Sequence, residues 1–334
     1  MLRIKVRLPN GIDYNDKIYG DPIVVGGEGR IYRYYHSKLG DCRIKLYHSI
    51  NKAAKRKDKI YFLIKNRFPT IHPKIQYCWP LAAVYDEFGI NFLGFIMEAT
   101  PNNSRDLTIL SNHIIGRTIK QEFPREYKWY ENDKYELNSL IGIKNRITLL
   151  INWAVAIRAI HNKGIYCLAD IKPENVFITP DGSISIIDID SMQIHTNDIF
   201  YKASAVTPEY FPREAYIQKS SGQPLMSSCD SFAFGCCAYM VLTGTHPYNN
   251  IILKPPYNTL EYSTIASCIK ADLYIRGNKA NYISKVSQDY DLQSNFDKLP
   301  YSIRLVLNKS LGKADNRPTF DEWVKFLKQG KDEL

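Results

Sequence analysis

The sequence contains no run of eighteen consecutive apolar residues, whereas a transmembrane helix needs about 20 of them, so no membrane span is expected. Its seven cysteines are scattered and include no C-x-x-C pair, which indicates neither a disulfide framework nor a zinc site. The first residues alternate apolar and basic types without the apolar core of a signal peptide, a pattern that favours an edge strand. Together these absences predict a cytoplasmic protein.

Acidic residues are outnumbered, and the formal net charge is +10 at pH 7. Such a charge suits nucleic acid, an anionic membrane surface or an acidic partner. The basic residues are spread along the chain, however, and the densest segment, residues 52–59, is explained by a solvated helix face. A nucleic-acid partner is therefore not expected. A hydrophobic share of 45% in 334 residues predicts a substantial core, in two domains or one large domain of two parts.

Residues 165–190 hold four polar residues at fixed offsets among apolar ones: Asp170, Lys172, Asn175 and Asp188. Residues 176–178 and 184–186 predict two short strands joined by a turn at Pro180–Gly182. The hairpin would hold Asn175 and Asp188 at its open end, so that all four side chains converge. One acid near a lysine and an asparagine, with a second acid beyond a hairpin, suits phosphoryl transfer from a magnesium nucleotide.

The same stretch resembles the catalytic loop and the metal-binding loop of protein kinases, H-R-D-x-K-x-x-N followed by D-F-G. Leu168–Ala169 replace His-Arg, and Ile189–Asp190 replace Phe-Gly. The resemblance implies an α+β fold of two lobes. It places a small antiparallel β lobe with one helix at residues 1–98 and a mainly helical lobe at residues 99–334. Residues 101–143, which are largely polar, are interpreted as an insertion within the second lobe, serving as a contact surface or as a packed helix.

A strand, a glycine turn and a second strand are predicted over residues 22–34. Glycine lets backbone N–H groups approach phosphates that a Cβ would block. The segment resembles the kinase glycine-rich loop, although a valine stands where the first glycine usually is. The residues that the resemblance places around the nucleotide here are Val24, Gly26, Gly27, Gly29 and Ile31.

Lys45, on a predicted strand after the glycine turn, resembles the lysine that grips the α- and β-phosphates. Arg43 stands where the family has a small alanine over the adenine, and it shares a strand face with Lys45. Arg43 must therefore bend away or take part in binding. The predicted helix at residues 49–67 lacks the glutamate that the family pairs with this lysine. Its only acid, Asp58, either makes that pair or is an ordinary surface aspartate.

Two strands over residues 84–98 are predicted to form a hairpin that leads to the connection between the lobes. Met97 resembles the gatekeeper residue of the family. Glu98 and Ala99 resemble the hinge, whose backbone would hydrogen-bond the adenine.

The second half of the chain continues the resemblance. Apolar residues from Leu149 to Ile160 follow helical spacing, and His161 at the helix end is interpreted as structural. The family's central helix begins at Asp230, which is expected to hold the catalytic-loop backbone. Glu214, at the end of a segment that starts at Thr207, is expected to form an ion pair with Arg317.

The resemblance implies a Mg-ATP-dependent protein serine/threonine kinase. Asp170 would accept or orient the proton of the substrate hydroxyl, and Lys172 would neutralise the transferred phosphoryl group. Asn175 and Asp188 would hold magnesium, and Lys45 would hold the nucleotide phosphates. The alternatives are a pseudokinase that binds without efficient transfer and a small-molecule phosphotransferase of related fold.

Two further expectations concern regulation and partners. Ala169 offers no cation to receive a phosphate on Ser191, Thr196 or Ser204. Activity is therefore expected without phosphorylation of the segment that holds these three residues. The D-I-D version of the metal loop resembles a bacterial kinase subgroup found with helix-hairpin-helix domains or with tellurite-resistance phosphatase and von Willebrand-type partners. Besides ATP and a protein substrate, a cognate phosphatase or adaptor protein is a possible partner.

Overall fold

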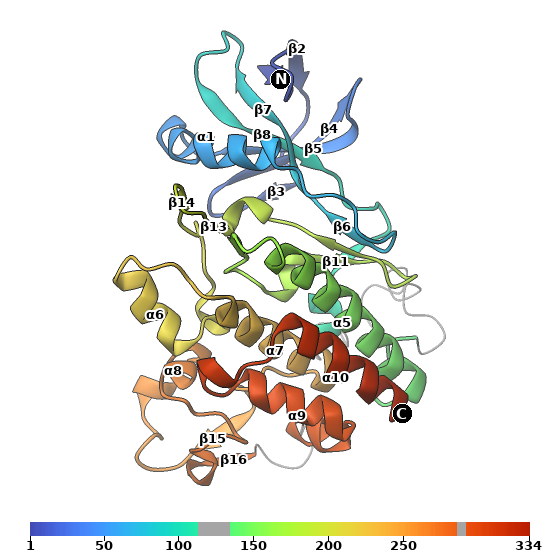
Figure 1. The fold of residues 1–334 in the computed structure, drawn as a ribbon, viewed down its shortest axis with the longest axis vertical. Helices are drawn as coiled ribbons and strands as arrows, with labels where there is room; N and C mark the ends of the chain where they lie inside the picture. Colours follow the sequence, from blue (N-terminus) through green and yellow to red (C-terminus); the bar gives the residue numbers. More distant parts are fainter. Residues whose placement is uncertain (113–133, 286–291) are drawn as a thin grey trace. The chain divides into compact units, whose positions relative to one another are not determined.

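A computed structural model describes residues 1–112, 134–285 and 292–334, which form two compact units (Figure 1). The first unit comprises Met1–Thr70, Gln76–Asn102 and Ser185–Asp190, and the second comprises Ile71–Ile75, Asn103–Ile184 and Ser191–Leu334. This division differs from the predicted boundary at residue 98 chiefly because residues 185–190 belong to the first unit. The centre of the predicted insertion, residues 113–133, lies outside the described residues.

The first unit is built on an antiparallel seven-stranded sheet in the order β2-β1-β7-β8-β5-β4-β3. Alternation along the strands sends one set of apolar side chains, including Ile4, Val6 and Ile44, into a common core. The strands are β1 (Leu2–Arg7), β2 (Asp13–Ile18), β3 (Val24–Val25), β4 (Gly29–His36), β5 (Gly40–Tyr47), β7 (Pro80–Asp86) and β8 (Phe92–Glu98).

One helix, α1 (Ile50–Lys65), packs on this sheet (Figure 1). Ser49 caps its N-terminus by accepting a hydrogen bond from the Lys52 amide. The Trp79 indole donates to the Leu63 carbonyl at 2.8 Å, which ties the helix to the segment before β7. The buried residues of α1 include Lys59, a cation on the side of the helix that faces the sheet.

The second unit is mainly helical. Aromatic contacts join its long helices, since the Phe234 ring lies 5.1 Å from that of Trp153 and 4.8 Å from that of Trp323. The helices are α2 (Thr108–Ser111), α5 (Leu140–His161), α6 (Arg213–Ser220), α7 (Ser227–Thr243), α8 (Ile265–Lys270), α9 (Tyr301–Ser310) and α10 (Phe320–Asp332). The apolar helix predicted over Leu149–Ile160 is the second half of α5, which ends at His161 as expected.

By length and composition alone, α5 could also cross a membrane. Half of its apolar window is buried inside the structure, and its residues pack against α7 and α10. It serves as a core helix of the second unit.

Short strands and 3-10 turns make up the other elements of the described residues. The predicted hairpin is present as β11 (Val176–Ile178) and β12 (Ile184–Ile186), closed by a hydrogen bond from the Thr179 amide to the Ser183 carbonyl. The other strands are β6 (Ile75–Tyr77), β9 (Arg105–Asp106), β10 (Tyr166–Cys167), β13 (Gln193–His195), β14 (Phe200–Tyr201), β15 (Ile251–Leu253) and β16 (Ile283–Lys285). The 3-10 helices are Pro173–Asn175, Ile189–Ser191, Pro208–Tyr210, Leu260–Tyr262, Ala280–Tyr282, Leu292–Lys298 and Ala314–Asn316.

A β unit with one helix and a mainly helical unit make up the α+β fold that the sequence predicts.

Candidate active site

The loop after β10 is held by a buried carboxylate. Asp230, in the first turn of α7, accepts hydrogen bonds from the amides of Leu168 (2.7 Å) and Ala169 (2.8 Å). The Nε2 atom of His161 lies 2.8 Å from the same carboxylate. Ala169 has a left-handed φ of 64°, a conformation that these bonds stabilise. The predicted structural roles of Asp230 and His161 are confirmed.

Asp170, the next residue in this loop, lies in a closed set of polar contacts. Its Oδ1 accepts a hydrogen bond of 2.6 Å from the Thr207 hydroxyl, and its Oδ2 lies 2.9 Å from the Lys172 ammonium. Lys172 also donates to the Thr207 oxygen at 3.0 Å. The Asn175 amide nitrogen donates to the Asp170 carbonyl at 2.8 Å. An acid and a cation therefore meet at one hydroxyl oxygen, as a transfer site for an alcohol requires.

The chain around Thr207 is fixed by two further contacts. The His246 Nε2 donates to the Glu209 carbonyl at 3.0 Å, in the 3-10 turn that follows Thr207. Glu214 forms the predicted ion pair with Arg317, whose side chain is almost fully buried. These contacts fix the Thr207–Glu214 segment within the second unit.

In the first unit, the Lys45 ammonium lies between two carboxylates of the 185–190 segment. It is 2.6 Å from Asp188 Oδ1 and 2.9 Å from each oxygen of Asp190. Burial alone would lower the pKa of Lys45, but the charges of Asp190 and Asp188 outweigh it and raise this pKa. The two carboxylates therefore favour the charged form of Lys45. Asp188 itself has a left-handed φ of 56°.

Asp188 belongs to the first unit, whereas Asp170, Lys172 and Asn175 belong to the second. The structure brings the latter three together, and the convergence of all four stays a prediction.

The glycine turn lies between β3 and β4, where the Gly26 amide donates to the Gly29 carbonyl. A Cβ on Gly29 would collide with the Leu46 carbonyl of β5, so only glycine fits there. Val24 pairs with Ile31 across the two strands. A Cβ on Gly27 would meet no atom within 4 Å, so packing within the protein does not require glycine there.

Two contacts of the glycine turn were not foreseen from the sequence. Glu28 forms an ion pair of 2.7 Å with Arg56 of α1, and the His48 Nε2 lies 2.7 Å from the Gly26 carbonyl. The sequence contained two signals for the ion pair, an acid inside the glycine turn and a basic helix that follows it. These contacts link the turn to α1 and to the chain just before it.

The predicted alternative that Asp58 pairs with Lys45 is wrong in this structure. Asp58 is exposed on α1, and the acids that contact Lys45 are Asp188 and Asp190. Adjacent helical residues point about 100° apart, so the buried face of α1 carries Lys59 in place of Asp58. Asp58 is therefore removed from the candidate nucleotide-binding residues.

Of the two expectations for Arg43, the structure shows the one in which it bends away. Its guanidinium folds back along its own strand, 3.0 Å from Asp41 and 2.7 Å from the Cys42 carbonyl. Met97, the expected gatekeeper, is buried in β8 opposite Arg43.

The expected hinge residues already make contacts within the first unit. Glu98 forms an ion pair with Arg67, and the Ala99 carbonyl accepts a hydrogen bond of 3.0 Å from the Gln76 side chain. These bonds hold the backbone at the end of β8.

The expectation that Ser191 is open to phosphorylation is wrong, because the residue is buried. The Ser204 amide donates to the Ser191 carbonyl at 2.9 Å. The nearby Arg213 forms an ion pair of 3.4 Å with Asp272.

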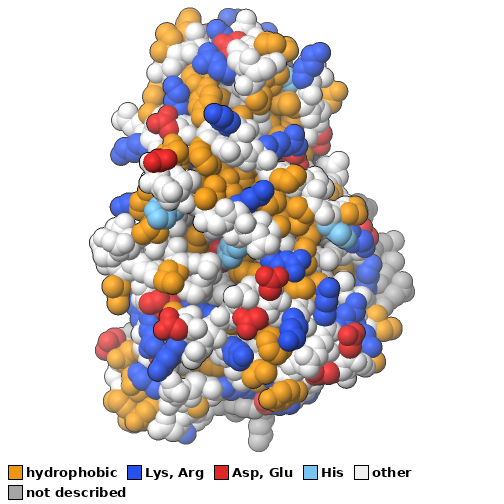
Figure 2. Space-filling view, in the orientation of Figure 1, with side chains coloured by type: hydrophobic (Ala, Val, Ile, Leu, Met, Phe, Trp, Pro, Cys, Tyr) orange, Lys and Arg blue, Asp and Glu red, His pale blue; other side chains and the backbone are white. Residues whose placement is uncertain are grey.

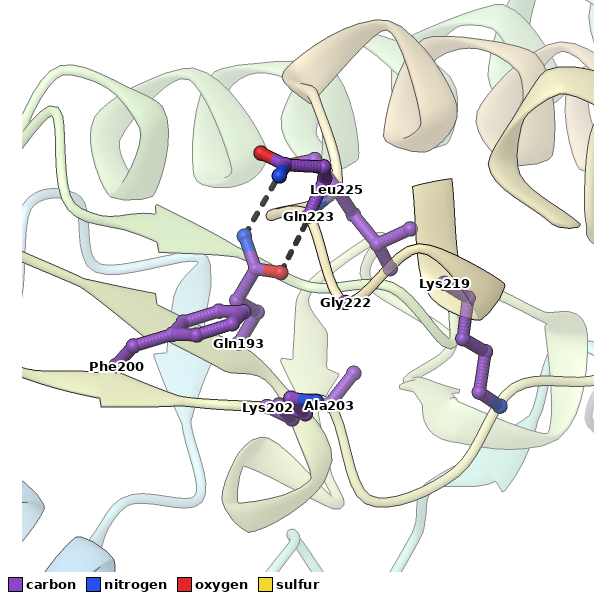
Figure 3. Close-up of a pocket in the computed structure, with 8 residues that line it drawn as sticks. All are labelled: Gln193, Phe200, Lys202, Ala203, Lys219, Gly222, Gln223 and Leu225. Carbon is purple, nitrogen blue, oxygen red and sulfur yellow. Dashed lines mark hydrogen bonds between the residues drawn. The ribbon is translucent and has the colours of Figure 1, made fainter. Parts of the chain in front are cut away.

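A small pocket of about 60 Å³ lies beside β13 and β14 in the second unit (Figure 3). Gln193 and Leu225 close one side of it through two hydrogen bonds, of 3.0 and 2.8 Å. Pockets for small-molecule ligands usually measure about 300–1,000 Å³, so this one is too small for a nucleotide. None of its lining residues is a predicted site residue.

The charged side chains are dispersed on the surface in view. Figure 2 shows Lys and Arg side chains interspersed with acidic and apolar ones over this face. This pattern matches the spread of basic residues along the sequence.

Comparison with known proteins gives the family. Residues 131–324, more than half of the chain, match the protein kinase domain. A probable serine/threonine-protein kinase of Clostridium acetobutylicum is 28% identical over 148 residues, which cover 42% of this chain and 19% of the relative.

Other relatives point the same way. The dual specificity protein kinase Ttk of Danio rerio is 26% identical over 235 residues, or 68% of this chain and 20% of the relative. A probable cAMP-dependent protein kinase catalytic subunit of Encephalitozoon cuniculi is 33% identical over 110 residues, or 33% of this chain and 32% of the relative. The matched part spans about a third or less of each relative's length. With the domain match and the two-unit α+β fold, these similarities show that the chain belongs to the protein kinase family.

Proposed function

We propose that this chain is a Mg-ATP-dependent protein serine/threonine kinase that transfers the γ-phosphoryl group to a protein hydroxyl. The observation that carries the proposal is the set of contacts among Asp170, Lys172 and Thr207. There the Asp170 carboxylate accepts a hydrogen bond from the Thr207 hydroxyl, which stands in for a substrate hydroxyl, and the Lys172 ammonium donates to the same oxygen. This is the arrangement in which an alcohol oxygen can attack phosphorus.

In the proposed reaction, the substrate oxygen forms a bond to the γ-phosphorus and the bond from that phosphorus to the bridging oxygen of ADP breaks. The substrate hydroxyl proton passes to the Asp170 carboxylate. Lys172, 2.9 Å from Asp170, balances the negative charge of the phosphoryl group as it moves. Little covalent work falls to the protein, so positioning and charge neutralisation supply most of the rate.

The groups proposed to bind the nucleotide lie in the first unit. Lys45 would supply positive charge for the α- and β-phosphates. Gly26 and Gly27 would let the loop backbone approach the phosphates, and Gly29 would keep the strand that carries the loop packed against β5. Val24, Ile31 and Met97 are the proposed apolar contacts of the base, which the backbone of Glu98 and Ala99 would hydrogen-bond.

Magnesium fits the oxygen ligands that Asn175 and Asp188 provide. Magnesium is usually held by one or two carboxylates together with substrate phosphates and water, and a dedicated protein cage is not needed. When bound, the ion neutralises phosphate charge. Within the described parts of the chain, no group of three or more His, Cys, Asp or Glu side chains could hold a metal by itself.

The pseudokinase alternative rests on Leu168–Ala169, Arg43 and the missing helix glutamate. Against it, Arg43 is bonded to Asp41, and the loop that contains Ala169 is held by Asp230. The ion pair of Glu214 with Arg317 favours a protein substrate over a small-molecule one, because it orders the Thr207–Glu214 segment, which resembles the end of the activation segment of protein kinases. A cytoplasmic location and a cognate phosphatase or adaptor protein are also proposed.

The test is transfer of labelled γ-phosphate from ATP to a generic protein substrate, followed by phosphoamino-acid analysis. Label on serine and threonine that requires magnesium supports the proposal, and Asp188→Ala should abolish it. Asp198→Asn is the matched control, since this exposed aspartate lies outside the proposed site and should leave the rate unchanged. Label on tyrosine alone would refute the serine/threonine assignment. Absence of transfer, together with no stabilisation by millimolar Mg·ATP, would favour the pseudokinase.

A further inference from the structure

Asp190 stands where kinases with the D-F-G loop have glycine, and it is a buried acid. Its side chain is only 2% exposed. Both carboxylate oxygens accept hydrogen bonds of 2.9 Å from the Lys45 ammonium, and the Tyr47 hydroxyl donates to Oδ2 at 3.3 Å. A buried carboxylate with this many donors has a defined position, because leaving it unpaired would cost several kcal/mol.

Helix α1 presents a cation to the same cluster. Lys59 is buried, and burial lowers its pKa to about 8, while the negative charge of Asp190 opposes that shift. Of the charged groups that act on Lys59, Asp190 has the largest effect, ahead of Arg56, Glu28 and Asp188. In other kinases this helix supplies the acid that pairs with the phosphate-binding lysine. Here that acid lies on the 185–190 segment, and the helix supplies a buried lysine instead.

Two lysines, Lys45 and Lys59, and two carboxylates, Asp188 and Asp190, belong to this cluster. If Asp188 binds a metal ion, its charge is committed to that ion. Asp190 is then the carboxylate left to hold Lys45 in place.

We propose that Asp190 positions Lys45 for the nucleotide phosphates, with the charge of Lys59 on α1 as its second counterion. The inference rests on the proposed function, since it assumes that Lys45 binds phosphate. Asp190 is a positioning residue that acts through Lys45. It follows that this kinase needs no acid on α1 to orient its phosphate-binding lysine.

The experiment compares Asp190→Asn, Asp190→Gly and the double variant Asp190→Gly with Lys59→Glu. Mg·ATP affinity is measured by titration calorimetry, and kcat and KM are measured for ATP and for the protein substrate. Asp190→Asn is expected to weaken Mg·ATP binding and to raise the KM for ATP by about tenfold or more, because a misplaced reacting group costs rates of this order. The KM for the protein substrate should stay constant, a separation that a general loss of folding would not give.

The double variant is the decisive arm. It returns an acid to α1 and a glycine to position 190, so it should recover Mg·ATP affinity to within about threefold of the wild type, a difference of roughly 0.6 kcal/mol. Asp190→Gly alone should remain weak. Melting curves without nucleotide report whether each variant folds, and Asp21→Asn, an exposed acid of the same unit, is the control.

Each outcome decides something. Wild-type affinity in a folded Asp190→Asn variant would overturn the inference. If that variant does not fold, a double variant that binds no better than Asp190→Gly would overturn it equally. A wild-type protein that neither binds nor uses Mg·ATP would instead refute the proposed function.

Discussion

Replacing Arg317 by alanine removes a buried cation that several groups of the second unit share. Its guanidinium is paired with Glu214, donates to the carbonyls of Ser228 and Gly312, and lies 4.9 Å from the centre of the Phe232 ring. The Arg317 side chain is 3% exposed and that of Glu214 is 25% exposed. The substitution therefore leaves a partly buried carboxylate and two carbonyl groups without their donor.

Breaking a buried ion pair from one side usually costs about 3–5 kcal/mol. Water can reach the partly exposed Glu214 and recover some of that loss, so we expect a value near the lower end, about 3 kcal/mol. For a domain of this size, each kcal/mol lowers the melting temperature by roughly 2–4 °C, so the expected fall is about 6–12 °C.

Urea unfolding followed by circular dichroism, together with scanning calorimetry, measures both quantities. The matched control is Arg158→Ala, which also removes one cation from an ion pair. Arg158 and Asp321 are 3.1 Å apart, but their side chains are 34% and 72% exposed. Exposed pairs contribute about 0–1 kcal/mol, so this variant should melt close to the wild type. Equal, small effects of the two substitutions would refute the reasoning that burial gives the Arg317 pair its strength.

Three further predictions concern other parts of the second unit. Burial lowers the pKa of His246 to about 3, whereas the pKa of an unfolded histidine is near 6.5. Below pH 6.5 the unfolded state therefore binds more protons than the folded state, and the free energy of unfolding decreases as the pH is lowered. Urea unfolding at pH 7 and pH 5 should show a loss of about 2 kcal/mol that is absent in His246→Asn. A Cβ at Gly235 would collide with Ser310 of α9, so Gly235→Ala should lower the free energy of unfolding in urea by about 1–3 kcal/mol. Adding Ser310→Gly should restore part of that stability, and no recovery would show that the collision is not the cause. Because Ala169 supplies no cation, the dephosphorylated enzyme, checked by mass, should have the same initial rate as the phosphorylated form. A rate lower by about tenfold or more, restored by rephosphorylation, would show that another residue receives the phosphate.

The parts of the account that the sequence predicts depend on short-range spacing. The hairpin of β11 and β12 follows from apolar alternation around a Pro-Asp-Gly turn, and the glycine turn follows from its flanking strands. Asp230 and the ion pair of Glu214 with Arg317 were found because family motifs mark their positions even though the partners are far apart in the chain.

The partners of Lys45 could not be predicted in the same way. The sequence offered one acid in α1, Asp58, but which helical face is buried depends on packing against the sheet. A shift of one residue rotates the side chain by about 100° and brings Lys59 inside. That Asp190 folds back onto Lys45 depends on the path of the 185–190 segment, which local propensity does not determine.

The contact of Thr207 with Asp170 also needed the structure. Several hydroxyl residues occur between Ser191 and Thr207, and the sequence does not say which of them reaches the acid. The fixed backbone around Glu209 and Glu214 selects Thr207.

The measurement that tests the central claim most directly is the time course of phosphoryl transfer by the wild type and by Asp170→Asn, read as the intact mass of the protein substrate. Asparagine keeps the size of the side chain but cannot take the hydroxyl proton, and general-base catalysis contributes about 10²–10⁴-fold. We predict steady phosphate addition by the wild type and a rate lower by at least about a hundredfold for the variant, with circular dichroism showing that both proteins are folded. Equal rates for the two proteins would contradict the assignment of Asp170 as the residue that receives the proton.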